Sequence, residues 1–206
     1  MTRYSYSNLA CYQQCPAKYR YENVLKLPRE TAAAASRGTD LHSELEQAIN
    51  SGNPPDHLKP HVWDLIARFA KAEVRIELDA NWQPTDEEPR YVGVIDVLID
   101  RPPHIDIIDW KSGKVRDYSD QLMFYNVLAL SRGHEWRTAK AKAIFIDAGF
   151  RQSPEVKLAR ADLTAAQQRI DEKIERLERD TIFAPNPSFL CRYCSYRKDN
   201  GGPCKW

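Results

Sequence analysis

The 206-residue sequence has no apolar run that approaches the ~18 residues of a membrane-spanning helix. Its first residues, MTRYSYSNLA, lack the apolar core of a secretion signal. Internal repeats and low-complexity tracts are not evident either. We therefore expect a protein of the cytoplasm that has no membrane partner.

An excess of charge of either sign is also missing, because 30 Lys and Arg residues face 29 Asp and Glu residues, a net charge of +1. This balance neither requires nor excludes a nucleic-acid partner, since an acidic metal site can offset a basic binding groove. The 42% hydrophobic and 29% charged residues are typical of a globular protein. The length suits one domain over residues 1–206, with a buried core.

Cysteine is absent between positions 15 and 191, and the five cysteines are Cys11, Cys15, Cys191, Cys194 and Cys204. In an intracellular chain, a Cys-x-x-Cys pair near one end is more typical of a metal site than of disulfides. Gly201, Gly202 and Pro203 allow the chain to turn back to the last cysteine. The fourth ligand then has to be Cys11 or Cys15, which would join residues 5–22 to residues 185–206. Zinc and an iron-sulfur cluster both accept four thiolates.

Residues 93–111, GVIDVLIDRPPHIDIIDWK, are typical of two β-strands joined by a tight Pro-Pro connection. Side chains two positions apart in a strand share a face, so Asp109 and Lys111 point the same way. A hairpin would bring Asp96 beside Asp109. Two carboxylates held together repel each other unless a cation lies between them. The alternative is that both are ordinary residues near strand ends, without a catalytic role.

The other expected elements surround this hairpin. His42 follows Gly38 at a spacing of i and i+4 in a predicted helix, although a lone helical histidine is more often structural than a metal ligand. Gln121 and Tyr125 have the same spacing, which places an amide and a phenol on one side of a helix. Periodicity predicts a helix at 4–22, with Ser5 or Ser7 as its N-cap and a stop or kink at Cys15-Pro16. It also predicts helices at 38–50, 61–72, 119–131 and from 164 onward, and strands at 73–79 and 139–147. This order predicts an α/β domain with a small mixed sheet covered by helices.

Six short motifs in sequence order resemble the PD-(D/E)XK nucleases, and within them the RecB-like group that includes the CRISPR-associated nucleases with a four-cysteine iron-sulfur cluster. The motifs are Cys15-Pro16 after the Ser7-x-Leu9 helix, Gly38-x-x-x-His42, Gly93-x-x-Asp96, Asp109-x-Lys111, Gln121-x-x-x-Tyr125 and the C-terminal cysteines. The resemblance covers nearly the whole chain. It implies a restriction-endonuclease-like core in which a cluster joins the two ends of the chain.

The resemblance also implies roles for individual residues. Asp96, Asp109, the carbonyl of Trp110 and His42 would hold Mg²⁺ or Mn²⁺, since oxygen ligands suit both ions and an imidazole favours Mn²⁺. Lys111 would orient or deprotonate the attacking water. Gln121 and Tyr125 would position the DNA strand. A [4Fe-4S] cluster, or Zn²⁺ as the alternative, would be held by Cys15, Cys191, Cys194 and Cys204.

The expected function is a metal-dependent DNA nuclease, acting as a single-strand exonuclease in recombination, repair, phage replication or spacer acquisition. Its partners would be DNA and the recombination, replication or CRISPR-adaptation proteins of a bacterial, archaeal or phage-infected cell. The first alternative is a catalytically silent DNA-binding or assembly subunit with the same fold and cluster. The intact set of His42, Asp96, Asp109 and Lys111 argues against it. The second alternative is a zinc-stabilised binding protein without a nucleic-acid role.

Overall fold

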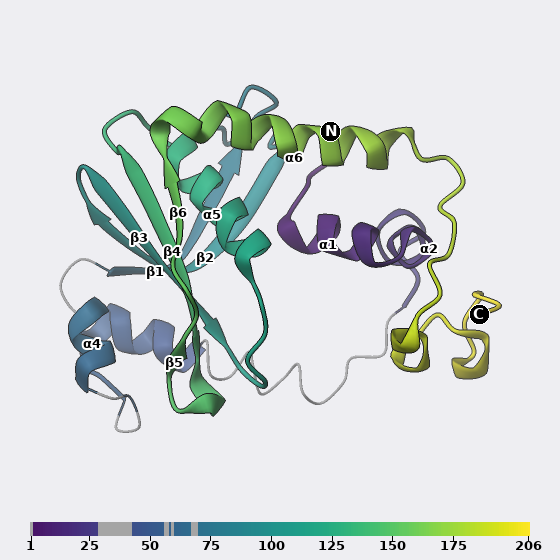
Figure 1. Ribbon diagram of the computed structural model, residues 1–206, viewed down its shortest axis with the longest axis horizontal. Coiled ribbons are helices and arrows are strands. Elements are labelled where there is room, and N and C mark those ends of the chain that lie inside the picture. Colours follow the sequence, from purple (N-terminus) through teal and green to yellow (C-terminus); the bar gives the residue numbers. More distant parts are fainter. Residues whose placement is uncertain (1, 29–42, 56–57, 59, 67–69) are drawn as a thin grey trace. The chain divides into compact units, whose positions relative to one another are not determined.

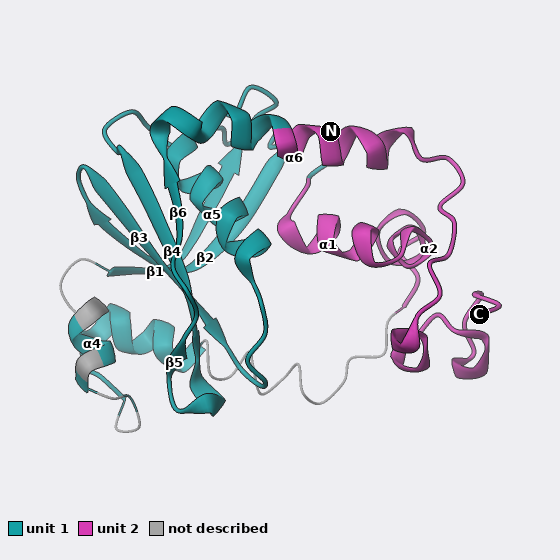
Figure 2. Cartoon of the chain, in the orientation of Figure 1, with its two compact units in different colours: residues 1–3, 33–168 teal, residues 4–32, 169–206 magenta. Residues whose placement is uncertain are grey.

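The computed structural model describes residues 2–28, 43–55, 58, 60–66 and 70–206 (Figure 1). The chain divides into two compact units (Figure 2). Unit 1 contains residues 1–3 and 33–168, and unit 2 contains residues 4–32 and 169–206. Unit 2 is therefore built from segments near both ends of the sequence. No helix in the described ranges combines the length and the apolar character that crossing a membrane requires.

Unit 1 is organised around a six-stranded mixed sheet (Figure 1). The strands are β1 (Ala70–Leu78), β2 (Tyr91–Arg101), β3 (His104–Lys111), β4 (Thr138–Phe145), β5 (Arg151–Gln152) and β6 (Val156–Ala159). They lie in the order β1-β2-β3-β4-β5, and β6 also pairs with β4. The β3–β4 pair is parallel and the other pairs are antiparallel. The small mixed sheet predicted from the sequence is confirmed.

Helices accompany the sheet of unit 1. Helix α5 (Ser119–Ser131) connects β3 to β4, as the parallel pairing of these strands requires. Residues 43–51 are helical, and α4 (Pro60–Ile66) follows them. Two short 3₁₀ turns, η2 (Ile146–Ala148) and η3 (Arg160–Asp162), lie around β5 and β6. Helix α6 (Leu163–Arg179) then leads from unit 1 into unit 2.

Residues 97–99 of β2 and 107–110 of β3 are buried on both faces, which explains their nearly continuous hydrophobic sequence. On one face, Val97, Ile99, Ile108 and Trp110 join a core that also contains residues of the 43–51 helix and α4. Helix α5 packs closely against β2 at Gly93. A Cβ atom there would lie 2.5 Å from Cδ1 of Leu128, so only glycine fits without displacing that side chain.

Residues 70–72 were predicted as the end of a helix, and this prediction is wrong. In the structure they begin β1, where Ala70 lies opposite Ile99 and Ala72 lies opposite Val97. Pairing with the long hydrophobic strand β2 overrides the weak local preference of an Ala-Lys-Ala segment for helix. The edge strands β5 and β6 were not predicted, because two and four residues are too short to show a periodic pattern.

Unit 2 begins with α1 (Tyr6–Gln14), whose N-cap is Ser5, one of the two caps predicted. The Ser5 hydroxyl accepts from the Asn8 N–H at 3.3 Å, and the Asn8 side chain accepts from the Ser5 N–H at 3.1 Å. The helix ends at Cys15, and Pro16 starts the short helix α2 (Pro16–Tyr19), so the predicted break is confirmed. A π-helical turn, η1 (Arg20–Val24), follows.

Side-chain contacts within unit 2 join its two sequence segments. The rings of Tyr12 and Tyr19 pack against Phe183, with centroids 6.4 and 6.2 Å apart. The Tyr12 hydroxyl also donates to Asp180 at 2.9 Å. Two short 3₁₀ turns complete the unit, η4 (Phe189–Tyr193) and η5 (Lys198–Asn200). The two segments therefore belong to one compact structure through contacts that do not involve cysteine.

Candidate active site and cysteine pocket

Asp96 and Asp109 come together where β2 and β3 pair. Val97 lies opposite Ile108 in this antiparallel register, and the two aspartates occupy the next position along both strands. The carboxylate of Asp96 accepts a hydrogen bond of 2.7 Å from the backbone N–H of Trp110. Asp109 is buried, with 1% of its surface exposed. Asp96 is half-buried, so the hairpin holds the two carboxylates side by side at the boundary between the interior of unit 1 and solvent.

The surroundings of this pair shift the pKa of Asp96. Burial raises the pKa of Asp96 well above its usual range, and the neighbouring Asp109 raises it further. The Trp110 N–H and the Lys111 ammonium act in the opposite direction, since both stabilise the charged form of Asp96. A divalent cation would favour the ionised form of both carboxylates in the same way, so the pair suits a hard metal ion.

Lys111 completes the local charge arrangement. Its Nζ lies 2.6 Å from Oδ2 of Asp109 and 4.6 Å from the centre of the Tyr118 ring. Tyr118 in turn packs against Phe145 of β4, with centroids 5.9 Å apart. The ammonium is thus held between a carboxylate and an aromatic face, and it is attracted to both. The side chain is 16% exposed, so it lies at the boundary between the interior and solvent.

Helix α5 contributes the amide and the phenol predicted from the i and i+4 spacing. Nε2 of Gln121 lies 2.9 Å from the Tyr125 hydroxyl and 3.4 Å from Oδ1 of Asp109. Burial, followed by the nearby Asp109, raises the pKa of the Tyr125 phenol, which therefore stays protonated. The structure brings Asp96, Asp109, Lys111, Gln121 and Tyr125 into one site, whereas their catalytic roles stay predictions.

Glu73 is a further acidic residue beside this site, and it was not predicted from the sequence. In β1, Ala72 lies opposite Val97 and Val74 lies opposite Ile95, which places Glu73 opposite Asp96. Its charge raises the pKa of Asp96, while burial and then Glu46 raise the pKa of Glu73 itself. The alternating sequence of β1 gave no signal, because Glu73 looks like any polar residue on the solvent face of a strand.

Two further metal ligands were predicted, His42 and the carbonyl of Trp110. His42 and Gly38 lie outside the described residues, which resume at residue 43 in a helix. Trp110 is buried in the core and lies next to Asp109 in β3, so its contribution to the site comes from its backbone. Within the described ranges, no group of three or more His, Cys, Asp or Glu side chains could hold a metal ion. In the described part of the chain, Asp96 and Asp109 are therefore not joined by a third side chain in such a group.

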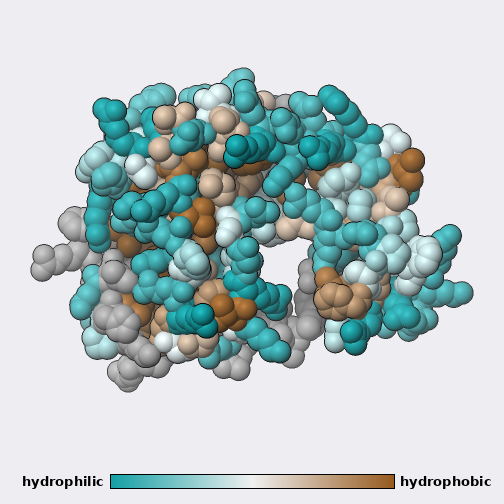
Figure 3. Space-filling model, in the orientation of Figure 1, coloured by the Kyte–Doolittle hydropathy of each residue, from teal (hydrophilic) through white to brown (hydrophobic). Residues whose placement is uncertain are grey.

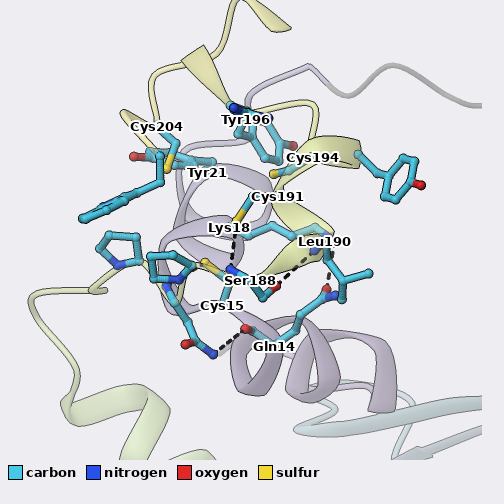
Figure 4. Close-up of a pocket in the computed structure, with 16 residues that line it drawn as sticks. Gln14, Cys15, Lys18, Tyr21, Ser188, Leu190, Cys191, Cys194, Tyr196 and Cys204 are labelled. Carbon is cyan, nitrogen blue, oxygen red and sulfur yellow. Dashed lines mark hydrogen bonds between the residues drawn. The ribbon is translucent and has the colours of Figure 1, made fainter. Parts of the chain in front are cut away.

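Four cysteines line one pocket in unit 2, with a volume of about 150 Å³ (Figure 4). They are Cys15, Cys191, Cys194 and Cys204, the four predicted to share a cluster. Cys11 does not line this pocket, and its Sγ lies 3.7 Å from Oε2 of Glu22. Burial, and then the charge of Glu22, raises the pKa of the Cys11 thiol to about 11, which disfavours a thiolate ligand at this position.

Backbone N–H groups and a tight turn position the sulfur atoms around this pocket. The Asn186 N–H donates to Sγ of Cys15 at 3.4 Å, and the Ser188 N–H donates to Sγ of Cys191 at 3.3 Å. The predicted turn before Cys204 is present, since the Lys198 N–H donates to the Cys204 carbonyl at 2.7 Å. Gly202 is required there, because a Cβ atom would collide with the backbone of Tyr196.

The predicted four-cysteine cluster itself is not shown. All five cysteines are free thiols, and no cysteine group in the described part of the chain could hold a single metal ion. What the structure does show is that four sulfur ligands from both ends of the sequence line the same pocket. Backbone N–H groups donate to two of these sulfurs.

Comparisons with known proteins were made for the sequence and the fold. A model described as the PD-(D/E)XK nuclease superfamily matches residues 3–90 and 61–198, which together span most of the chain. The search of curated proteins found no match.

Two solved structures are similar in fold. One is titled "Crystal structure of SSO0001" and has a TM-score of 0.54 at 18% identity, covering 95% of this chain and 84% of that one. The other is titled a "Putative exonuclease" from Eubacterium rectale and has a TM-score of 0.58 at 12% identity, covering 95% and 88%. At these identities the likeness concerns the fold alone.

Proposed function

Since this chain belongs to the PD-(D/E)XK nuclease superfamily, we propose that it is a divalent-metal-dependent deoxyribonuclease that degrades single-stranded DNA from its ends. The observation that carries the proposal is the pair formed by the buried Asp109 and the half-buried Asp96, with the Lys111 ammonium 2.6 Å from Asp109. Two carboxylates and one amine at the edge of a buried hairpin form a set of groups that can bind a hard cation and move a proton.

Each residue of the set has a proposed task. Asp96, Asp109 and the carbonyl of Trp110 would hold Mg²⁺ or Mn²⁺ through oxygen atoms. When bound, such an ion polarises the phosphodiester and lowers the pKa of its water ligand. The Trp110 N–H fixes one oxygen of Asp96, which leaves the other oxygen of that carboxylate for the ion.

Lys111 would act on the attacking water. Its ammonium lies 2.6 Å from Oδ2 of Asp109, so it would lie close to a water bound at this carboxylate. Gln121 contacts both Asp109 and the Tyr125 hydroxyl, and this link would let the two α5 residues position the scissile strand. Because the Tyr125 phenol stays protonated, it would serve as a hydrogen-bond donor to a phosphate oxygen.

End dependence tests the proposed mode of action. We expect linear single-stranded DNA to be shortened progressively in Mn²⁺ and a circular strand of the same sequence to stay intact, because a strand without ends offers an exonuclease no starting point. The measurement is gel electrophoresis of both substrates over time, with the linear strand labelled at either end. Equal degradation of the circle would show endonuclease action instead.

His42 is proposed as a further metal ligand, on the resemblance of its motif alone. His42→Ala is expected to weaken Mn²⁺ binding and to lower activity, because one ligand of the ion is lost. Titration of the DNA-free protein with Mn²⁺, followed by electron paramagnetic resonance, measures the affinity. His104→Ala is the matched control, since His104 is exposed at the start of β3, distant in the strand from Asp109. An unchanged Mn²⁺ affinity in His42→Ala would make His42 a structural residue.

For unit 2 we propose a [4Fe-4S] cluster held by Cys15, Cys191, Cys194 and Cys204, with Zn²⁺ as the alternative. Support comes from the shared pocket and from the N–H groups of Asn186 and Ser188 that point at two of the sulfurs. The cluster would be structural, because its four ligands come from both ends of the sequence while the aspartate pair belongs to unit 1. Its role would be to fix the conformation of the C-terminal segment.

A further inference from the structure

In the described part of the chain, the exposed aromatic residues lie in one short segment. Among the described Phe, Tyr and Trp side chains, those classed as exposed are Phe189, Tyr193 and Trp206, at 70%, 74% and 52%. In Figure 3, hydrophilic side chains cover most of the visible face of the molecule and hydrophobic ones appear in small groups. An exposed aromatic ring gains nothing from burial in the fold, so three within 18 residues suggest a ligand for this segment.

Two of these rings are held in defined positions rather than on a free tail. Phe189 and Tyr193 are the first and last residues of η4. Between them, Arg192 places its guanidinium 5.3 Å from the centre of the Tyr193 ring and donates from Nε to the Phe189 carbonyl at 3.1 Å. The Ser188 side chain caps the turn through the Leu190 N–H. One arginine therefore lies between two exposed rings in a fixed turn.

The third ring belongs to the same part of unit 2. Trp206 and Tyr193 both line the pocket that the four cysteines share, together with Lys18 and Arg197. Cys191 lies within η4 between Phe189 and Arg192, so a metal group bound to Cys191 would also fix this turn. The hydrogen bonds of η4 hold Phe189 and Tyr193 in place, and this order lowers the entropy lost when a ligand binds.

The charge of this segment differs from that of the rest of the chain. Residues 185–206 contain four basic residues and one acidic residue, whereas the whole chain contains 30 and 29, which leaves 26 and 28 for the remainder. Asp199 pairs with Arg197 at 2.6 Å, so Arg192, Lys198 and Lys205 supply the excess positive charge. This segment therefore has a net positive charge of +3, whereas the remainder of the chain has a net charge of −2.

From this combination we infer that residues 189–206, with Phe189, Tyr193 and Trp206 as stacking rings and Arg192, Lys198 and Lys205 as phosphate contacts, bind single-stranded nucleic acid. Unpaired bases stack on aromatic side chains while basic residues follow the backbone. Binding of a polyanion is favoured by an excess of positive charge on this segment, whereas binding of a protein partner does not require such an excess. The inference rests on the proposed function for its ligand, but it assigns the strand a second site, in unit 2 and distinct from the aspartate pair.

The test is the affinity for fluorescently labelled oligothymidine, measured by anisotropy in EDTA so that no strand is cut. The full-length double variant Phe189→Ala/Tyr193→Ala is expected to bind at least about tenfold more weakly than the wild type, because base stacking is lost at two rings. Ile182→Ala is the matched control, since Ile182 is 77% exposed in unit 2 but is not aromatic, and it should bind like the wild type. Phe189→Tyr/Tyr193→Phe keeps both rings and should keep the affinity.

Salt dependence supplies a second readout for the basic residues. Lys198→Ala/Lys205→Ala should flatten the slope of log affinity against log salt by about 1.4, since each lost contact to a single strand removes about 0.7. Its melting temperature and iron content should equal those of the wild type. If the double variant Phe189→Ala/Tyr193→Ala, here called the ring-deletion variant, bound oligothymidine with the wild-type affinity, the inference would be overturned. The inference would also be overturned if the wild type bound no oligothymidine. If Phe189→Ala/Tyr193→Ala kept the wild-type affinity but changed the oligomeric state, the rings would instead form a contact between copies of the protein.

The outcomes separate this inference from the proposed nuclease function. If the wild type cleaves DNA and the ring-deletion variant binds and cleaves equally well, the binding surface is wrong and the nuclease assignment stands. If the ring-deletion variant loses binding while the wild type cleaves nothing with Mn²⁺, the binding surface stands and the nuclease assignment fails.

Discussion

Asp109→Asn is expected to lower the rate of single-strand cleavage at least about a thousandfold, because a bound metal contributes several kcal/mol to stabilising the transition state. An amide keeps the shape of the side chain but removes the charge that attracts a divalent cation. Lys111→Met should also lose cleavage, by about a hundredfold or more, since it removes the group proposed to handle the proton of the attacking water. The measurement is the initial cleavage rate of an end-labelled strand in Mn²⁺.

A matched control lies on the same strand. Asp106→Asn removes a carboxylate three positions before Asp109, and side chains an odd number of positions apart point to opposite faces of a strand. This variant should therefore cleave at nearly the wild-type rate. Thermal unfolding of all three variants verifies that they are folded. Cleavage at the wild-type rate by Asp109→Asn would remove the aspartate pair from the active site.

Cys15→Ser is expected to give a colourless protein with a clearly lower melting temperature, whereas Cys11→Ser should keep its cluster and its stability. Cys15 lies in the shared pocket and beside Asn186, 171 positions later in the sequence, while Cys11 lies outside that pocket. A link that closes so long a loop stabilises a chain by roughly 5 kcal/mol in the chain-entropy model used for disulfides. This is comparable with the net stability of a whole domain.

The loss should nevertheless fall short of complete unfolding. Tyr12 with Asp180, and the ring contacts of Tyr12 and Tyr19 with Phe183, join the two segments of unit 2 independently of cysteine. Iron, sulfide and zinc analysis of anaerobically purified protein, with visible absorption and a thermal melt, measures the effect. If the analysis found zinc and no iron, the bound metal would be Zn²⁺ and not an iron-sulfur cluster. Retained metal and an unchanged melt in Cys15→Ser would show that no metal group joins the ends through this residue.

The central hairpin could be predicted from sequence because its signals are local. Two hydrophobic runs separated by Pro102-Pro103 define β2 and β3, and alternation along them places Asp109 and Lys111 on one face. The i and i+4 spacing of Gln121 and Tyr125 is equally local, and the structure joins these residues at 2.9 Å. The N-cap Ser5 and the break at Pro16 follow from the preferences of single residues.

Features that depend on tertiary packing could not be predicted. The start of β1 at Ala70 is set by its pairing with Ile99, and nothing within the Ala-Lys-Ala segment indicates it. The proximity of Glu73 to Asp96 depends on the register between β1 and β2. The hydrogen bond from the Trp110 N–H to Asp96 likewise requires the folded hairpin. Division into two compact units follows from contacts between segments that are far apart in the sequence.

The central claim is that Asp96 and Asp109 hold a divalent metal with which the protein cuts DNA, and one measurement addresses it most directly. This is the cleavage rate of an end-labelled single strand by the wild type and by Asp109→Asn, each in EDTA and across the same Mn²⁺ titration. We predict no cleavage by either protein in EDTA, a rate that rises to saturation with Mn²⁺ for the wild type, and no comparable rise for the variant. Undiminished wild-type cleavage in EDTA, or the same Mn²⁺-dependent rise in Asp109→Asn, would contradict the claim.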